Sequence, residues 1–203
     1  MSSERLNLTQ RRRAATELEI ARAAAKLFAA HGLDQTTVER IAQSAGISLR
    51  TFYRYFPTKE EALAPLLQVG AESWQQSLRS GTALSLYERI DRSIAEVLDA
   101  GALQRTGDAD ATRVLLRQRH GHQGVIDIWH RVNARSEQVL GPLLREVAPD
   151  LAPHRALLWA AAATCSIRLA IESWADDSAH SQAPVATWAR ENFRLLSAGL
   201  SQE

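Results

Sequence analysis

The sequence predicts an all-α protein. Proline and glycine, which interrupt helices, number only six and ten among 203 residues. Apolar residues recur every three or four positions over long stretches, which is the period of an amphipathic helix. No alternation of apolar and polar residues runs far enough to indicate a strand. The limits of each helix follow from its capping residues and from the breaks between helices.

Three helices are predicted in the first 60 residues. The first spans about residues 13–31 and stops at a glycine. The second follows Thr36, whose spacing to Glu39 fits a capping box. A tight turn at Gly46 leads to the third helix, which is short and begins after the N-cap Ser48.

A long helix is predicted next, from about residue 59 to residue 80, with Thr58 and Glu61 as its capping box. Pro65 then falls beyond the first turn, so we expect it to kink the helix and to act as a hinge. The same apolar period predicts five further helices, separated by the stretches GALQRTGD, Gly121, VAPDLAP and DDSAHSQAP, at about 84–100, 108–120, 122–148, 153–175 and 184–200.

Composition and charge narrow the class of protein. The N-terminus has no apolar core of a signal peptide, and the longest apolar run, ALLWAAAA at 156–163, is too short to span a bilayer. Cys165 is the single cysteine, which fits a reducing compartment, so we expect a cytoplasmic protein. Residues 1–60 carry a net charge of +4 and residues 61–203 a net charge of −3, which favours an anionic partner for the first segment alone.

The stretch GISLRTFYRYFPTKEEAL, residues 46–63, indicates what that partner is. Two short helices joined by a three-residue turn containing glycine are the sequence form of a helix-turn-helix. Ile47 and Phe52 are predicted to fill the angle between the helices, which leaves basic and aromatic side chains outside. In this geometry such side chains meet base edges and phosphates in the major groove of DNA.

This region resembles the N-terminal domain of the TetR/AcrR transcriptional regulators. The matching elements lie in AAAKLFAAHGLDQTTVERIAQSAGISLRTFYRYFPTKEEAL, and the resemblance covers about residues 14–63. It implies an all-helical homodimer, usually a repressor released from a pseudo-palindromic operator by a small organic effector. By position, it implies DNA contacts from the following residues: Thr37, Tyr53, Tyr55 and Lys59 to phosphates, and Ser48, Leu49, Arg50, Thr51 and Arg54 at the base-reading end. Arg50 stands where many members have a small residue, and it either reads a guanine or binds a phosphate.

The resemblance also implies two segments. Residues 1–58 would form a three-helix, helix-turn-helix DNA-binding domain, and a long helix would join it to a helical ligand-sensing and dimerisation domain at 59–203. The stretch QRRR at 10–13 would be a basic arm reaching along the DNA or a solvated tail.

The last two predicted helices suggest a dimer interface. Small residues form one row on the first and apolar residues one face on the second, which would suit a four-helix contact between two chains or a core within one. The predicted set is Ala162, Ser166, Ala170, Val185, Trp188, Ala189, Leu196 and Leu200.

A pocket for an apolar or aromatic ligand is predicted among the middle helices, although each aromatic candidate also fits simple core packing. The candidates are Trp74, Arg119, His120, Trp129, Trp159, Cys165 and Trp174. The pair His120 and His122 is too small a set for a metal site, so we expect no metal, no other cofactor and no membrane partner.

Other classes of function remain open from the residues alone. A transcriptional activator or an architectural DNA binder without a ligand would use the same helix-turn-helix. An enzyme lacks support, because no nucleophile elbow, phosphate-binding loop or dinucleotide motif is present. An adaptor that binds only protein would leave the tyrosines and arginines of 50–55 unexplained.

Overall fold

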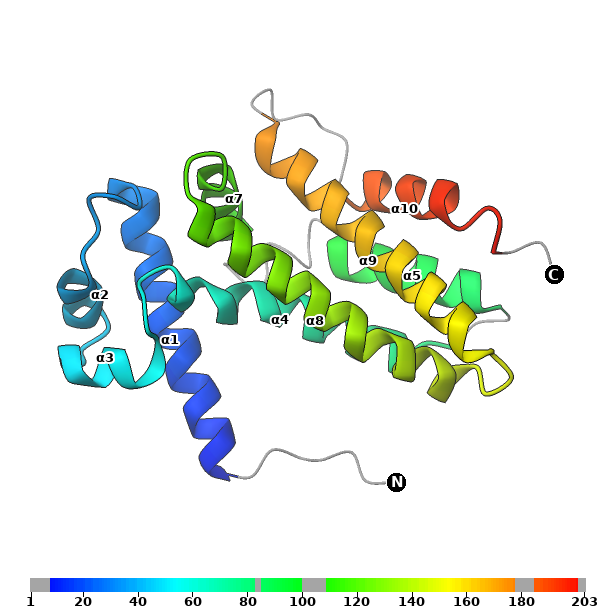
Figure 1. Cartoon of the computed structure of the whole chain (residues 1–203), viewed down its shortest axis with the longest axis horizontal. Coiled ribbons are helices and arrows are strands. Elements are labelled where there is room, and N and C mark those ends of the chain that lie inside the picture. The colour runs from blue at the N-terminus through cyan, green and yellow to red at the C-terminus, as the bar shows by residue number, and fades with distance from the viewer. Residues whose placement is uncertain (1–7, 83–84, 100–108, 178–184, 201–203) are drawn as a thin grey trace.

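The computed structural model describes residues 8–82, 85–99, 109–177 and 185–200, and every regular element in these ranges is helical. A small unit at one end contains the first three helices, α4 leads away from it, and the remaining helices form a larger bundle (Figure 1). The predicted fold class is therefore confirmed. The helices are α1 (Leu8–His31), α2 (Val38–Ser44), α3 (Leu49–Tyr55), α4 (Ala64–Ser80), α5 (Leu86–Leu98), α7 (Ala109–Gln118), α8 (Gln123–Val147), α9 (Pro153–Asp176) and α10 (Val185–Leu196).

The N-terminal unit is built around aromatic and branched residues from each of its helices. Phe28 of α1, Ile41 of α2 and Phe52 of α3 are fully buried in one cluster. Gly46 has a φ of +67°, the left-handed conformation that glycine adopts at little cost, and this turn sets the angle between α2 and α3. The cluster also includes Leu115 of α7, so the unit shares its core with the bundle.

The start of α2 differs from the prediction by one residue. Thr37 is the N-cap, and its hydroxyl accepts a hydrogen bond from the backbone N–H of Arg40 at 3.4 Å. Thr36 is instead fully buried, and its hydroxyl donates to the carbonyl of Gly32 at 2.8 Å. The sequence does not reveal which threonine of the pair caps α2, because the first one, Thr36, bonds instead to the end of α1.

The predicted basic arm is not separate from α1. The helix begins at Leu8, so residues 10–13 form its exposed first turns, and Arg13 pairs with Glu17 one turn later at 2.8 Å. The arginines of this stretch are therefore held in helical geometry. They lie on the part of α1 that extends beyond the N-terminal unit (Figure 1).

The predicted hinge at Pro65 rests on a wrong helix start. Glu61–Leu63 form a turn of 3₁₀-helix, and α4 begins at Ala64. Pro65 therefore lies in the first turn of α4, where its missing N–H has no helical partner to lose. The proline favours the start of a helix here and does not kink one.

The five helices predicted after residue 81 are present, with ends that differ by at most a few residues, and the predicted breaks at 101–108 and 178–184 lie outside the described residues. In the bundle, α9 packs against both α8 and α10 (Figure 1). Of the helices described, α9 alone is long and apolar enough to cross a membrane by length and composition, which the eight-residue run did not predict. Its packing against two neighbours is that of a core helix, where the same composition is expected.

Candidate functional site

The α3 helix separates a buried side from an exposed one. Its N-cap Ser48 accepts a hydrogen bond from the N–H of Thr51 at 3.1 Å, and the two hydroxyls lie 2.8 Å apart. Phe52 is fully buried, whereas the adjacent Tyr53 is 52% exposed. Arg50 is also exposed. Of the predicted base-reading residues, Ser48 and Thr51 are thus engaged in capping, while Leu49, Arg50 and Arg54 are exposed. Tyr53, predicted to contact a phosphate, is exposed on the same helix.

Two arginines bracket the ring of Tyr55. The guanidinium of Arg54 lies 5.3 Å from the ring centroid and that of Arg13 lies 5.7 Å from it, within the range of a cation–π contact. Tyr55 is half-buried against the core, so its ring serves as a support for both cations. The contact brings the basic first turns of α1 beside α3, and the sequence reasoning missed this role of Arg13.

Lys59 differs most from its predicted role. Its ammonium donates to the backbone carbonyls of Leu33 at 2.8 Å and Thr36 at 3.1 Å. Two of its three donors therefore hold the segment between α1 and α2 against the segment that precedes α4. Thr37, predicted to contact a phosphate, is exposed at the N-terminus of α2, where it caps the helix.

A cavity of about 280 Å³ lies among α4, α5, α8 and α9. Three of the predicted residues, Trp74, Trp129 and Trp174, line it. Trp159 instead packs against Phe193 and borders a separate surface pocket formed beside α5 and α10. Asn133, Ser136 and Thr164 also line the cavity, and no sequence signal distinguished them from ordinary core residues.

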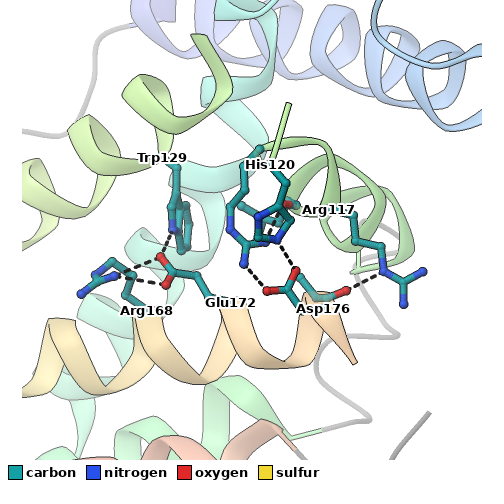
Figure 2. Close-up of polar contacts among 9 residues, drawn as sticks. Arg117, His120, Trp129, Arg168, Glu172 and Asp176 are labelled. Carbon is teal, nitrogen blue, oxygen red and sulfur yellow. Dashed lines mark hydrogen bonds and ion pairs between the residues drawn. The ribbon is translucent and has the colours of Figure 1, made fainter. Parts of the chain in front are cut away.

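Arg119 and His120 do not reach the cavity. Both contact the carboxylate of Asp176 at the end of α9, with His120 Nε2 at 2.9 Å (Figure 2). Burial alone would raise the pKa of Asp176, but hydrogen bonds and charge from Arg119 and His120 hold that pKa below its usual value. The stability that this contact gives is therefore present above the unfolded pKa of the carboxyl and is lost as the pH falls through the folded one.

The two predicted histidines face different partners. His122 Nδ1 lies 3.8 Å from Asp34, while His120 contacts Asp176. Within the described ranges, no group of three histidine, cysteine or carboxylate side chains could hold a metal ion.

A second polar group lies one turn earlier on α9. Glu172 accepts a hydrogen bond from the indole N–H of Trp129 at 2.7 Å and one from Arg168 at 3.0 Å (Figure 2). Arg168 also lies 3.6 Å from the sulfur of Cys165, which is therefore on the Arg168 side of α9 and not among the residues of the cavity wall. This group fixes the orientation of the ring of Trp129, which is one of the residues that line the cavity.

Gln118 joins the bundle to the N-terminal unit. Its side-chain amide donates to the carbonyl of Phe28 at 3.2 Å and accepts from the N–H of Leu33 at 3.0 Å. Arg131 of α8 adds a charged contact to Glu61 at 2.6 Å. A displacement of α7 or α8 would therefore shift the end of α1 and the segment before α4.

We expect Gln118→Ala to lower the free energy of unfolding by about 1–3 kcal/mol, because the part-buried N–H of Leu33 loses its partner. Chemical denaturation followed by circular dichroism measures this change. Gln123→Ala, at an exposed position five residues later, is the control and should change stability by about 0.5 kcal/mol or less. Equal effects of the two variants would contradict the role of Gln118.

The predicted dimer row is mostly internal. Ser166, Ala170, Val185 and Ala189 are all buried within one chain, where α9 and α10 pack against each other. Ala162, Trp188 and Leu200 pack partly against the same core, and Leu196 alone of the set is largely exposed. Small residues did mark a close helix contact, but the contact is intrachain. The exposed leucines on these two helices, which we call the outer leucines, are Leu157, Leu158, Leu169, Leu195 and Leu196.

Comparisons with known proteins identify the N-terminal region. Residues 20–64 match the family model "Bacterial regulatory proteins, tetR family". The HTH-type transcriptional regulator TcmR of Streptomyces glaucescens is 45% identical over 60 residues, a match that covers 29% of this chain and about a quarter (26%) of that relative.

Solved structures match nearly the whole chain. The fatty acid degradation regulator FadR of Bacillus halodurans has a TM-score of 0.59 at 20% identity, with 93% of this chain and 97% of that chain covered. FadR of Thermus thermophilus, a repressor solved in complex with lauroyl-CoA, has a TM-score of 0.57 at 22% identity, with 92% and 96% covered. At these identities the structures show a shared fold.

The sequence predicted a regulator without catalytic residues, and the matched family is one of regulatory proteins and is non-enzymatic. The α2–α3 geometry lies inside the matched residues, and the full-length fold agrees with that of FadR from Bacillus halodurans. Residues 20–64 therefore match the tetR family of bacterial regulatory proteins, and the chain as a whole shares the fold of solved regulators such as FadR.

Proposed function

We propose that the protein is a homodimeric transcriptional repressor that binds a pseudo-palindromic operator in the bacterial cytoplasm and leaves it when a small molecule fills the cavity. The observation that carries this proposal is the exposed side of α3, where Arg50 and Tyr53 project from a helix that Phe52 anchors in the core. In a helix-turn-helix, the second helix lies in the major groove and its first residues meet the base edges.

The proposed division of labour follows the two segments. Residues 1–58 bind DNA, and residues 59–203 form the dimer and take up the ligand. Exposed arginines at the start of α1 extend the basic surface beside α3, since Arg13 and Arg54 share the ring of Tyr55. They are suited to phosphates that flank the bases read by α3.

The dimer would form through the outer leucines of α9 and α10. Two copies related by a two-fold axis would then present two α3 helices about 34–36 Å apart, or a multiple of this spacing, to successive half-sites. Burial of exposed leucines in this contact supplies the association energy. The residues of the predicted small row take no direct part, because each chain already covers most of them.

For a ligand to release the protein from DNA, a structural change at the cavity must move α3. The cavity is lined by α4 and α8, and α8 contacts Glu61 through Arg131. A ligand that favours one arrangement of these helices would change the distance between the two α3 helices of the dimer. The ligand can shift the equilibrium between the two arrangements, and with it DNA affinity, only by as much free energy as its own affinity differs between them. That FadR of Thermus thermophilus is a repressor seen with lauroyl-CoA supports a ligand-responsive role for this fold.

Arg50→Ala tests the proposed contact with bases. If Arg50 reads a guanine, its loss should cost about 1–3 kcal/mol of binding energy and relax base preference at one position of the site. Fluorescence anisotropy with a panel of single-base operator variants measures both. Arg145→Ala, which removes an exposed arginine of α8 far from α3, is the matched control and should leave binding unchanged. Uniform weakening across the panel would assign Arg50 to a phosphate.

A further inference from the structure

The cavity walls offer a ligand mainly apolar contact. Trp74, Trp129 and Trp174 line the cavity together with leucine, isoleucine and valine side chains. The indole N–H of Trp74 donates to Ser93 at 3.0 Å, and that of Trp129 donates to Glu172 at 2.7 Å. Since both donors are occupied outside the cavity, these two rings present only carbon surface to a ligand.

Among the described residues of the wall, one fully buried side-chain polar atom has no partner. Thr164 is 5% exposed, and its hydroxyl makes no hydrogen bond, although a helical threonine ordinarily donates to the carbonyl four residues earlier. The neighbouring polar residues are engaged, because Ser136 accepts from Gln75 at 3.4 Å and Asn133 donates to a backbone carbonyl at 2.8 Å. Leaving a buried hydroxyl unpaired is costly, so a ligand that reaches this group from the cavity would supply its missing partner.

The charges around the cavity disfavour an anion. Among the described residues that line it, none is lysine, arginine or histidine, and the one charged residue is the exposed Glu96. Two arginines contact residues near the wall: Arg168 binds Glu172, and Arg113 lies over Trp174, where its Nη2 donates to a backbone carbonyl while its buried Nε has no partner. An ionised carboxylate or phosphate in the cavity would find no counter-ion among the lining residues, and burial of an unpaired charge is strongly unfavourable.

The volume limits the ligand to a small molecule. At roughly 30 Å³ per water, the cavity of about 280 Å³ would hold about nine water molecules, which places it at the small end of ligand pockets. Exposed residues of α4, Gly70 and Ser73, lie at its edge and mark where a ligand would enter.

We propose that the cavity binds a compact, neutral and largely aromatic or apolar molecule whose single hydrogen-bonding group pairs with the hydroxyl of Thr164. The inference rests on the proposed function, because it names the ligand class for the same cavity. It distinguishes this chain from the lauroyl-CoA complex of the Thermus thermophilus repressor, whose ligand carries several phosphate charges.

Three probes of nearly the same shape test the class of ligand by isothermal titration calorimetry at pH 7. We expect 2-naphthol, which is neutral and carries one hydroxyl, to bind at one site per chain. Naphthalene should bind more weakly because it cannot pair with Thr164. The anion 2-naphthoate should bind at least about tenfold more weakly than 2-naphthol, because its charge has no partner.

Thr164→Val tests the anchoring residue, since valine keeps the shape and removes the hydroxyl. Thr164→Val should weaken the binding of 2-naphthol by roughly three- to tenfold and leave the binding of naphthalene unchanged or tighter. Thr164→Ser should keep most of the affinity for 2-naphthol. The unliganded Thr164→Val protein should also melt about 2–4 °C higher than the wild type, because it no longer buries an unpaired hydroxyl. This second readout does not depend on any ligand.

Three results would overturn the inference: no binding of 2-naphthol, equal or tighter binding of 2-naphthoate, or the same 2-naphthol affinity in Thr164→Val. Release of DNA is measured separately, by anisotropy on a site selected from random DNA. If 2-naphthol binds as expected but DNA stays bound, the ligand class holds and ligand release fails. If lauroyl-CoA releases the DNA while 2-naphthol does not bind, ligand release holds and this inference fails.

Discussion

A chain that carries Leu158→Asp together with Leu195→Asp is expected to be monomeric and to bind its operator about a thousandfold more weakly. The two leucines are 52% and 58% exposed on α9 and α10, so the acidic side chains can remain solvated in the monomer. In a dimer they would bury four unpaired charges at one interface. A monomer contacts only one half-site, and the difference between specific and non-specific affinity is at least about 10³.

Sedimentation velocity measures the mass, and anisotropy with the selected operator measures the affinity. Val139→Asp is the matched control, because it places the same charge at a partly exposed apolar position of α8, outside the outer leucines. It should remain dimeric and bind normally. An unperturbed dimer in the double variant would show that the interface lies elsewhere on the molecule.

Phe52→Ala is expected to destabilise the N-terminal unit by about 3–5 kcal/mol, because it empties the centre of a packed cluster. The ring of Phe52 contacts Phe56 with a centroid distance of 5.7 Å, and the angle between α2 and α3 depends on it. Thermal and chemical unfolding measure the loss. DNA binding should fail with it, because α3 is no longer held in place.

Tyr53→Ala is the matched control for Phe52→Ala. It removes a neighbouring ring that is more than half exposed, so the free energy of unfolding should change little while DNA affinity falls. Full DNA binding by Tyr53→Ala would remove this tyrosine from the interface. A large loss of stability in Tyr53→Ala would mean that the inside and outside of α3 are not separated as described.

The N-terminal unit was predictable because its signals are local. Ser48 caps α3, Gly46 makes the turn, and Phe52 faces inward, each within a few residues of the feature that it determines. The errors in this region are also local, since Thr36 and Thr37 compete for one cap. The backbone contacts of Lys59 were not predictable for another reason, because its carbonyl partners lie more than twenty residues earlier in the chain.

The bundle was less predictable because its packing is long-range. Ala170 and Ser166 suit a close helix contact, but only the position of α10 decides whether that contact is within one chain. The tryptophans present the same difficulty, since Trp74 lines the cavity while Trp159 fills the core, and the two look alike in sequence. Thr164 could not be singled out from the sequence, because only the structure shows that its hydroxyl has no partner.

Selection of bound sites from a random DNA pool with the purified wild-type protein is the most direct test of the account. If the protein is a two-fold symmetric DNA-binding regulator, the enriched sites should share one pseudo-palindrome whose half-site centres lie about one helical turn, or a multiple of it, apart. The same pool selected with Arg50→Ala should lose preference at one position in each half-site. Enrichment of no sequence, or of a single motif without a symmetric partner, would contradict the account.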